Sequence, residues 1–147
     1  MNGPSQHLSW RELACYDPQH TPYPETWRKS RAVPLAIEFE RIRAAVGQPM
    51  VIGSAYRTPE WNRKVGGAPR SQHLEGRALD LYPPKHWTLD RFYAVIREVV
   101  GRPESLIYGL GRYPKFVHID IRQAPPHGGL TAWHGVRAWA EVKQATV

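Results

Sequence analysis

The segment 78–82 places a charged side chain between two leucines. Successive side chains of an extended strand point to opposite faces, so Leu79 and Leu81 share one face and Asp80 lies on the other. A carboxylate on a buried face is costly unless it is paired or bound to a metal ion. Ala78, on the same face as Asp80, leaves room for bulky neighbours. The segment therefore predicts a strand whose polar face holds an ion pair or a metal.

The segment 116–121 repeats this alternation, with His118 and Asp120 on the face opposite three aliphatic residues. If the two strands are neighbours in one sheet, Asp80 and His118 can reach a common point. Both residue types are common metal ligands.

A third candidate ligand, His73, precedes the first of these strands. Gly76 allows the intervening loop to turn sharply, so His73 can fold back over Asp80. Together with His118 this gives two imidazoles and one carboxylate. Three such protein ligands, with a fourth position left for water, are the arrangement of a catalytic zinc ion. We therefore expect one zinc ion per chain.

The rest of the chain predicts the frame that positions these residues. Apolar residues at helical spacing predict a helix that begins near residue 25 or 33 and ends before Gly47. Further helices are expected after the N-caps Ser9, Thr58 and Thr88, and strands at 50–52, 78–82, 106–108 and 116–121. The tail from residue 131 fits a strand or a helix. This order predicts an α+β fold, with a small, mainly antiparallel sheet flanked by helices.

The length of 147 residues fits a single domain, 1–147, in which residues 1–25 are a lead-in segment with one short helix. No apolar run approaches the roughly 20 residues of a membrane helix, and the N-terminus lacks the pattern of a signal peptide. The single cysteine, Cys15, agrees with a reducing compartment. We expect cytoplasmic synthesis and no integral membrane segment.

The net charge of +7 favours polyanions, and nucleic acid and the anionic bacterial wall are both candidates. The basic residues are scattered, and no nucleic-acid-binding motif accompanies them. We therefore expect no nucleic-acid partner. The sequence does not define the oligomeric state; a monomer is the working expectation.

Three motifs give the chain a specific resemblance. They are Ser-x-His-x-x-Gly-x-Ala-x-Asp at 71–80, Phe-Val-His-Ile-Asp at 116–120, and Ser-Ala-Tyr-Arg-Thr-Pro at 54–59. In this order and spacing they resemble the zinc D-Ala-D-Ala carboxypeptidase family, over about residues 7–122. That family includes VanX-type dipeptidases, phage endolysins and the hedgehog signalling domain. The short phage and bacterial branch is the most similar.

The resemblance implies roles for particular residues. His73, Asp80 and His118 would be the zinc ligands. Arg57 would bind a substrate carboxylate or carbonyl, a task suited to a planar guanidinium. Ser71 would line the site and contact the substrate or Asp80, although a turn or capping role is an equal alternative. Tyr56 would contact the substrate or simply pack.

One position departs from the family pattern. Relatives carry a Glu or Asp as general base three residues before the final histidine, where this chain has Lys115. Asp120 is the nearest carboxylate. It is either the base, and so a catalytic residue with Arg57, or an acceptor that orients a ligand histidine.

The resemblance implies a zinc-dependent peptidase that hydrolyses peptidoglycan stem peptides or cross-links, as a D-Ala-D-Ala carboxypeptidase or an endolysin. The metal would polarise the scissile carbonyl and activate a water as nucleophile. A phage enzyme of this kind would need a holin or another route to the wall. The alternative is a non-catalytic zinc-containing module that binds wall peptide or a protein partner.

Overall fold

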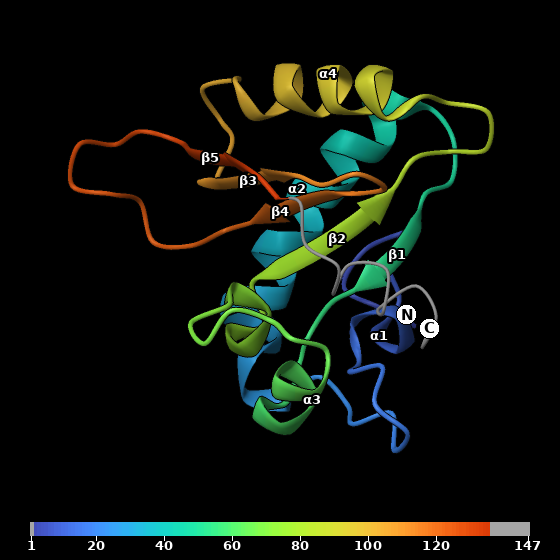
Figure 1. The fold of residues 1–147 in the computed structure, drawn as a ribbon, viewed down its shortest axis with the longest axis vertical. Helices are drawn as coiled ribbons and strands as arrows, with labels where there is room; N and C mark the ends of the chain where they lie inside the picture. Colours follow the sequence, from blue (N-terminus) through green and yellow to red (C-terminus); the bar gives the residue numbers. More distant parts are fainter. Residues whose placement is uncertain (1, 136–147) are drawn as a thin grey trace.

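The computed structural model describes residues 2–135 and is built on one five-stranded sheet (Figure 1). The strands are β1 (Val51–Ser54), β2 (Ala78–Tyr82), β3 (Gly109–Arg112), β4 (Val117–Asp120) and β5 (Thr131–His134). Their order across the sheet is β1-β2-β4-β3-β5. All neighbours are antiparallel except β3 and β5, which run parallel. The predicted α+β fold with a mainly antiparallel sheet is confirmed.

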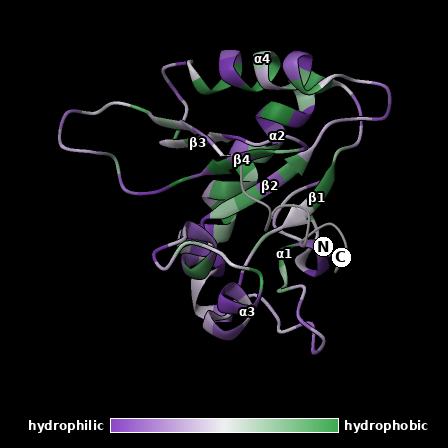
Figure 2. Ribbon diagram, in the orientation of Figure 1, coloured by the Kyte–Doolittle hydropathy of each residue, from purple (hydrophilic) through white to green (hydrophobic). Residues whose placement is uncertain are grey.

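Two longer helices, α2 (Val33–Val46) and α4 (Leu89–Val100), pack against each other. Figure 1 shows α2 running behind the sheet and α4 lying across its upper end. In α4, Figure 2 shows hydrophobic and hydrophilic residues on the same turns, as in a helix with one buried face. The core contains aliphatic residues from both helices and from β2, β3 and β4, among them Leu35, Ile42, Leu79, Ile96, Leu110 and Ile119.

The boundaries of both long helices follow the predicted signals. The chain is already helical from residue 25, through a 3₁₀ turn (Glu25–Trp27) and a π-helical turn (Arg28–Ala32) that lead into α2. Both predicted starts therefore mark real helical boundaries. Helix α2 ends at Gly47, whose φ of 76° is the left-handed conformation that glycine adopts without strain.

Three short helices lie in the chain segments that precede β1 and β2. They are α1 (Trp10–Leu13), α3 (Pro59–Lys64) and a 3₁₀ helix at Gln72–Glu75. Ser9 and Glu12 form the predicted capping box at α1. The side chain of Thr58 caps α3 by accepting a hydrogen bond from the backbone N–H of Trp61.

The strand predicted at 106–108 is wrong. Leu106 is 46% exposed, and the strand in this region is β3, at Gly109–Arg112. The tail beyond 131 forms a strand as far as His134, and the part after residue 135 lies outside the described residues. Within residues 2–135, no helix is long and apolar enough to cross a bilayer.

Candidate metal centre

One cross-strand row carries the polar residues at the centre of the sheet. Ser54 on β1 pairs with Asp80 on β2, Asp80 with His118 on β4, His118 with Gly111 on β3, and Gly111 with Trp133 on β5. Directly opposed residues of neighbouring strands share a face. The strand alternation that predicted Asp80 and His118 as neighbours is therefore realised by the β2–β4 pair.

His73 reaches this row from the 3₁₀ helix before β2. The hydroxyl of Ser71 accepts the backbone N–H of His73 at 3.2 Å and caps this helix. Gly76 ends it with a φ of 66°. The ring is oriented by Nδ1, which lies 2.6 Å from the carbonyl oxygen of Ala55. A carbonyl oxygen only accepts, so Nδ1 carries the hydrogen and Nε2 presents its lone pair.

The three predicted ligands converge on one carboxylate oxygen. Nε2 of His73 lies 3.1 Å from Oδ1 of Asp80, and Nδ1 of His118 lies 2.9 Å from the same atom. One ligand atom from each residue lies within 4.8 Å of the other two, and all three residues are buried. Facing nitrogen lone pairs and a carboxylate oxygen require a proton or a cation between them. This donor set fits a zinc ion.

Arg57 contacts the cluster through Asp80. Its Nη2 lies 3.5 Å from Oδ2 of Asp80, the oxygen that does not face the histidines. Its Nε donates to Ser54 Oγ and its Nη1 to Asn62 Oδ1, both at 3.0 Å. Burial lowers the pKa of Arg57 to about 10, which leaves the guanidinium charged at neutral pH. The side chain is 1% exposed, and it both holds Asp80 in place and lines the cavity.

Asp120 is buried between His118 and Arg122. Nε2 of His118 donates to its Oδ2 at 2.8 Å, and Arg122 donates to both carboxylate oxygens, also at 2.8 Å. Burial by itself would raise the pKa of Asp120, but the hydrogen bonds from Arg122 and His118 outweigh it and hold that pKa well below its usual range. A metal-binding histidine commonly donates its second ring N–H to a carboxylate in this way.

A cavity of about 340 Å³ opens onto the two histidines. Its lining includes three arginines, Arg57, Arg70 and Arg122, and the described residues of the lining include no Asp or Glu. Lys115 is exposed in the turn between β3 and β4. Arg57 and Arg122 face the carboxylates of Asp80 and Asp120, so Arg70 and a bound cation would supply the positive charge that suits an anionic ligand.

The remaining predicted residues divide between cavity and core. Ser71 lines the cavity as well as capping the 3₁₀ helix, so both of its predicted roles stay compatible with its position. Tyr56 is not among the residues lining the cavity. Its ring packs instead against Tyr23 and Trp27, each with centroids 6.0 Å away, beside the main core.

Four further residues belong to the site without having been assigned a role from the sequence: Ser54 and Asn62 accept hydrogen bonds from Arg57, and Arg122 and Trp133 line the cavity. Ser54 lies in the motif at 54–59, and Arg122 continues the alternation of β4, so a local signal existed for both. Asn62 and Trp133 reach the site through α3 and β5, whose placement depends on tertiary packing.

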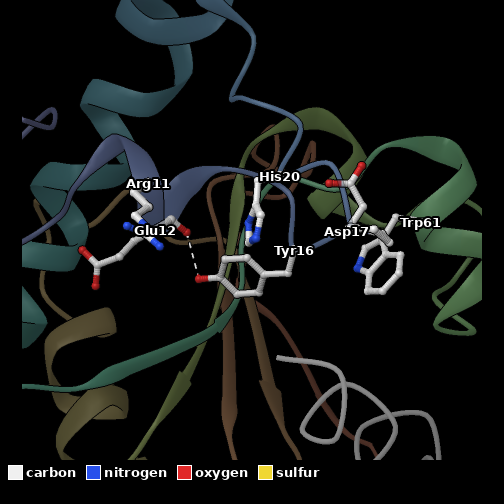
Figure 3. Close-up of a pocket in the computed structure, with 7 residues that line it drawn as sticks. Arg11, Glu12, Tyr16, Asp17, His20 and Trp61 are labelled. Carbon is white, nitrogen blue, oxygen red and sulfur yellow. Dashed lines mark hydrogen bonds between the residues drawn. The ribbon is translucent and has the colours of Figure 1, made fainter.

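A larger cavity, of about 550 Å³, lies elsewhere, between the N-terminal segment and α3 (Figure 3). Its two carboxylates serve their own segment. Glu12 accepts from Ser9 in the capping box, and Asp17 accepts the backbone N–H and the hydroxyl of Thr21. Tyr16 donates to the carbonyl oxygen of Glu12. This cavity is larger than the one at the histidines, but its acidic groups are engaged in local structure.

Comparison with known families identifies the same part of the chain. A family model described as Peptidase M15 matches residues 6–120, a range that contains the three cluster residues and Asp120. No curated protein matches the chain.

Proposed function

The chain belongs to the peptidase M15 family, as the motifs predicted, and on that premise we propose that it is a zinc-dependent peptidase acting on bacterial peptidoglycan. One observation carries this proposal beyond the family. His73, Asp80 and His118, which lie on three separate segments, bring their ligand atoms within 4.8 Å of one another. The neighbouring cavity is large enough for part of a peptide.

His73, through Nε2, and His118, through Nδ1, would hold the ion together with Asp80. When bound, zinc supplies an electrophile for the scissile carbonyl and activates water near neutral pH. The protein contributes orientation. The carbonyl of Ala55 fixes the ring orientation of His73, and the carboxylate of Asp120 fixes that of His118. Both hydrogen bonds are already formed.

Arg57 would act at the wall of the cavity. Its guanidinium is charged and held in place by Ser54 and Asn62, so it is preorganised to bind a carboxylate or a developing oxyanion. Preorganised donors cost no rearrangement during the reaction. Its contact with Asp80 means that the same residue also positions a zinc ligand.

Of the two roles open to Asp120, its contacts favour orientation of His118. Both carboxylate oxygens are engaged by Arg122 and one also by His118, and the side chain is fully buried. A general base must approach the proton that it removes. We therefore propose Asp120 as a positioning residue of the zinc site.

The substrate proposed is an anionic stem peptide or cross-link of peptidoglycan, cleaved in the manner of a D-Ala-D-Ala carboxypeptidase or an endolysin. The charge of Arg70 in the cavity lining, beside the proposed zinc ion, supports an acidic peptide, and Arg57 could bind a substrate carboxylate in addition to its contact with Asp80. If the protein serves phage lysis, a holin or another route must bring it to the wall.

A second function is favoured by one specific observation. Lys115 replaces the acidic residue of the family pattern, and among residues 2–135 no carboxylate lines the cavity to act as base. A zinc-containing module that binds wall peptide without cleaving it would have this composition.

Digestion of purified peptidoglycan, followed by mass analysis of the released muropeptides, separates the two functions. We expect new peptide termini with the zinc-loaded protein, none after treatment with a chelator, and recovery when zinc is returned. Zinc bound at one ion per chain, together with co-sedimentation with the wall but no new termini, would establish the binding module instead.

A further inference from the structure

We infer that Trp133 is a specificity-determining residue of this site, whose indole forms the wall against which the side chain of a substrate residue beside the scissile bond packs. This inference rests on the proposed peptidase function and adds a residue outside the range of the family match, which ends at residue 120. It assigns a role to β5, which lies at one edge of the sheet, opposite β1.

The register of the strands places Trp133 beside the site. Trp133 pairs with Gly111, which pairs with His118, so these residues continue the row that contains Asp80. Gly111 has no side chain, and the indole lies over it to approach the His118 ring, with centroids 5.3 Å apart. A Cβ at position 111 would lie 2.7 Å from the indole, closer than carbon atoms approach. The glycine therefore makes room for the tryptophan beside a candidate metal ligand.

Contacts on several sides fix the orientation of the indole. Its Nε1–H donates to the hydroxyl oxygen of Tyr113 at 3.0 Å. The guanidinium of Arg122, which holds Asp120, lies 5.2 Å from the ring centroid. The His118 ring packs against a third side, tilted by 50° to the indole. Because aromatic and cation–π contacts of this kind favour defined geometries, the wall is rigid rather than adaptable.

The other walls of the cavity are mostly of a different chemistry. Arginines and the polar residues Ser71 and Gln72 make up much of the lining. Tyr113 also lines it, but that ring is stacked on Phe116 at 4.6 Å and is 9% exposed. Among the described lining residues, Trp133 is a large aromatic side chain that is only half-buried, so its indole presents apolar surface beside the histidines. A fixed apolar wall there admits a small side chain, such as that of alanine, and excludes a large one.

The test uses synthetic wall peptides in which either residue flanking the cleaved bond is Ala, Val or Phe. The wild-type protein is compared with Trp133→Ala, Trp133→Phe and Gly111→Ala, the last of which displaces the indole without removing it. Trp87→Ala is the matched control, because Trp87 packs against Phe92 and Arg91 near α4, away from the histidines.

We expect zinc content of one per chain in every variant. For Trp133→Ala we expect the preference for Ala over Phe at one flanking position to fall by at least about tenfold, the discrimination that a pocket of this kind supplies. Gly111→Ala should shift preference in the same direction, Trp133→Phe should shift it less, and Trp87→Ala should leave it unchanged. An unchanged preference in Trp133→Ala and Gly111→Ala, with cleavage intact, overturns the inference.

The outcome remains separable from that of the proposed function. If zinc-loaded wild-type protein cleaves none of the peptides, the peptidase proposal fails, and calorimetric binding of the same peptides decides the role of Trp133. Binding that weakens about tenfold in Trp133→Ala supports the wall; equal binding in wild type and variant rejects it.

Discussion

The two faces of β4 are both buried, yet different interactions compensate their burial. Val117 and Ile119 lie in the hydrophobic core with residues from α2 and α4. His118 and Asp120, on the other face, are also buried, but they are surrounded by charged partners on β2 and in the segment after β4. Burial alone therefore does not distinguish a structural strand face from a functional one. The difference lies in whether the compensating groups are apolar side chains or a network of charged and hydrogen-bonding side chains.

The largest effect should follow from His118→Ala. This change removes one of the three proposed ligands, so we expect loss of bound zinc and a fall in peptide cleavage on the order of 1000-fold, about 4 kcal/mol of transition-state stabilisation. Zinc should raise the unfolding midpoint of the wild type and leave that of the variant unchanged, because a ligand stabilises only a state that it binds. Metal analysis and thermal unfolding with and without zinc measure both. Full zinc content with normal cleavage would remove His118 from the ligand set.

A change at Ile119, the next residue of β4, should affect the stability of the fold and not the binding of zinc. Ile119→Ala deletes fully buried aliphatic volume and should lower the free energy of unfolding by about 2–5 kcal/mol, by the same amount with and without zinc. Val51→Ala on β1, where the side chain is 65% exposed, is the matched control and should change it by less than about 0.5 kcal/mol. Urea unfolding provides the values. A cost that appears only in the zinc-loaded protein would contradict the division between the two faces.

A smaller effect is expected one residue further along. Asp120→Asn weakens the carboxylate contacts that orient His118, so zinc affinity should fall by about 10–100-fold. Asp90→Asn, which alters an exposed pair with Arg112, should leave the affinity unchanged. Competition with a chromophoric chelator measures it. Unaltered zinc affinity with turnover reduced about 100-fold would instead identify Asp120 as the general base.

The parts of the fold that the sequence predicts best are those with local signals. Strand β2 and helix α4 occupy the expected residues. The alternation of β2, and the Thr88 cap and helical spacing of α4, are local signals that do not depend on the rest of the fold. The candidate ligands could be identified for the same reason, since Asp80 and His118 each interrupt an aliphatic strand face. Their pairing across β2 and β4 followed once the two strands were taken as neighbours.

Strand β3 could not be identified in this way, and the reason is physical. Two of its four residues are glycines, which weaken strand signals. A Cβ at Gly109 would lie 2.2 Å from the carboxylate of Asp120, and Gly111 makes room for Trp133. The side chains of Asp120 and Trp133 occupy the space beside this strand, so glycine is needed at both positions. These glycines remove the alternation of side chains by which a strand is recognised in a sequence. The same tertiary dependence applies to β5, which reaches its parallel partner only after the long connection from β4 (Figure 1).

Anomalous diffraction at the zinc edge, from crystals grown with zinc, tests the central claim most directly. We expect one strong peak per chain, bounded by Nε2 of His73, a carboxylate oxygen of Asp80 and Nδ1 of His118. A peak bound by other residues, with these three side chains making only their hydrogen bonds to one another, would contradict it.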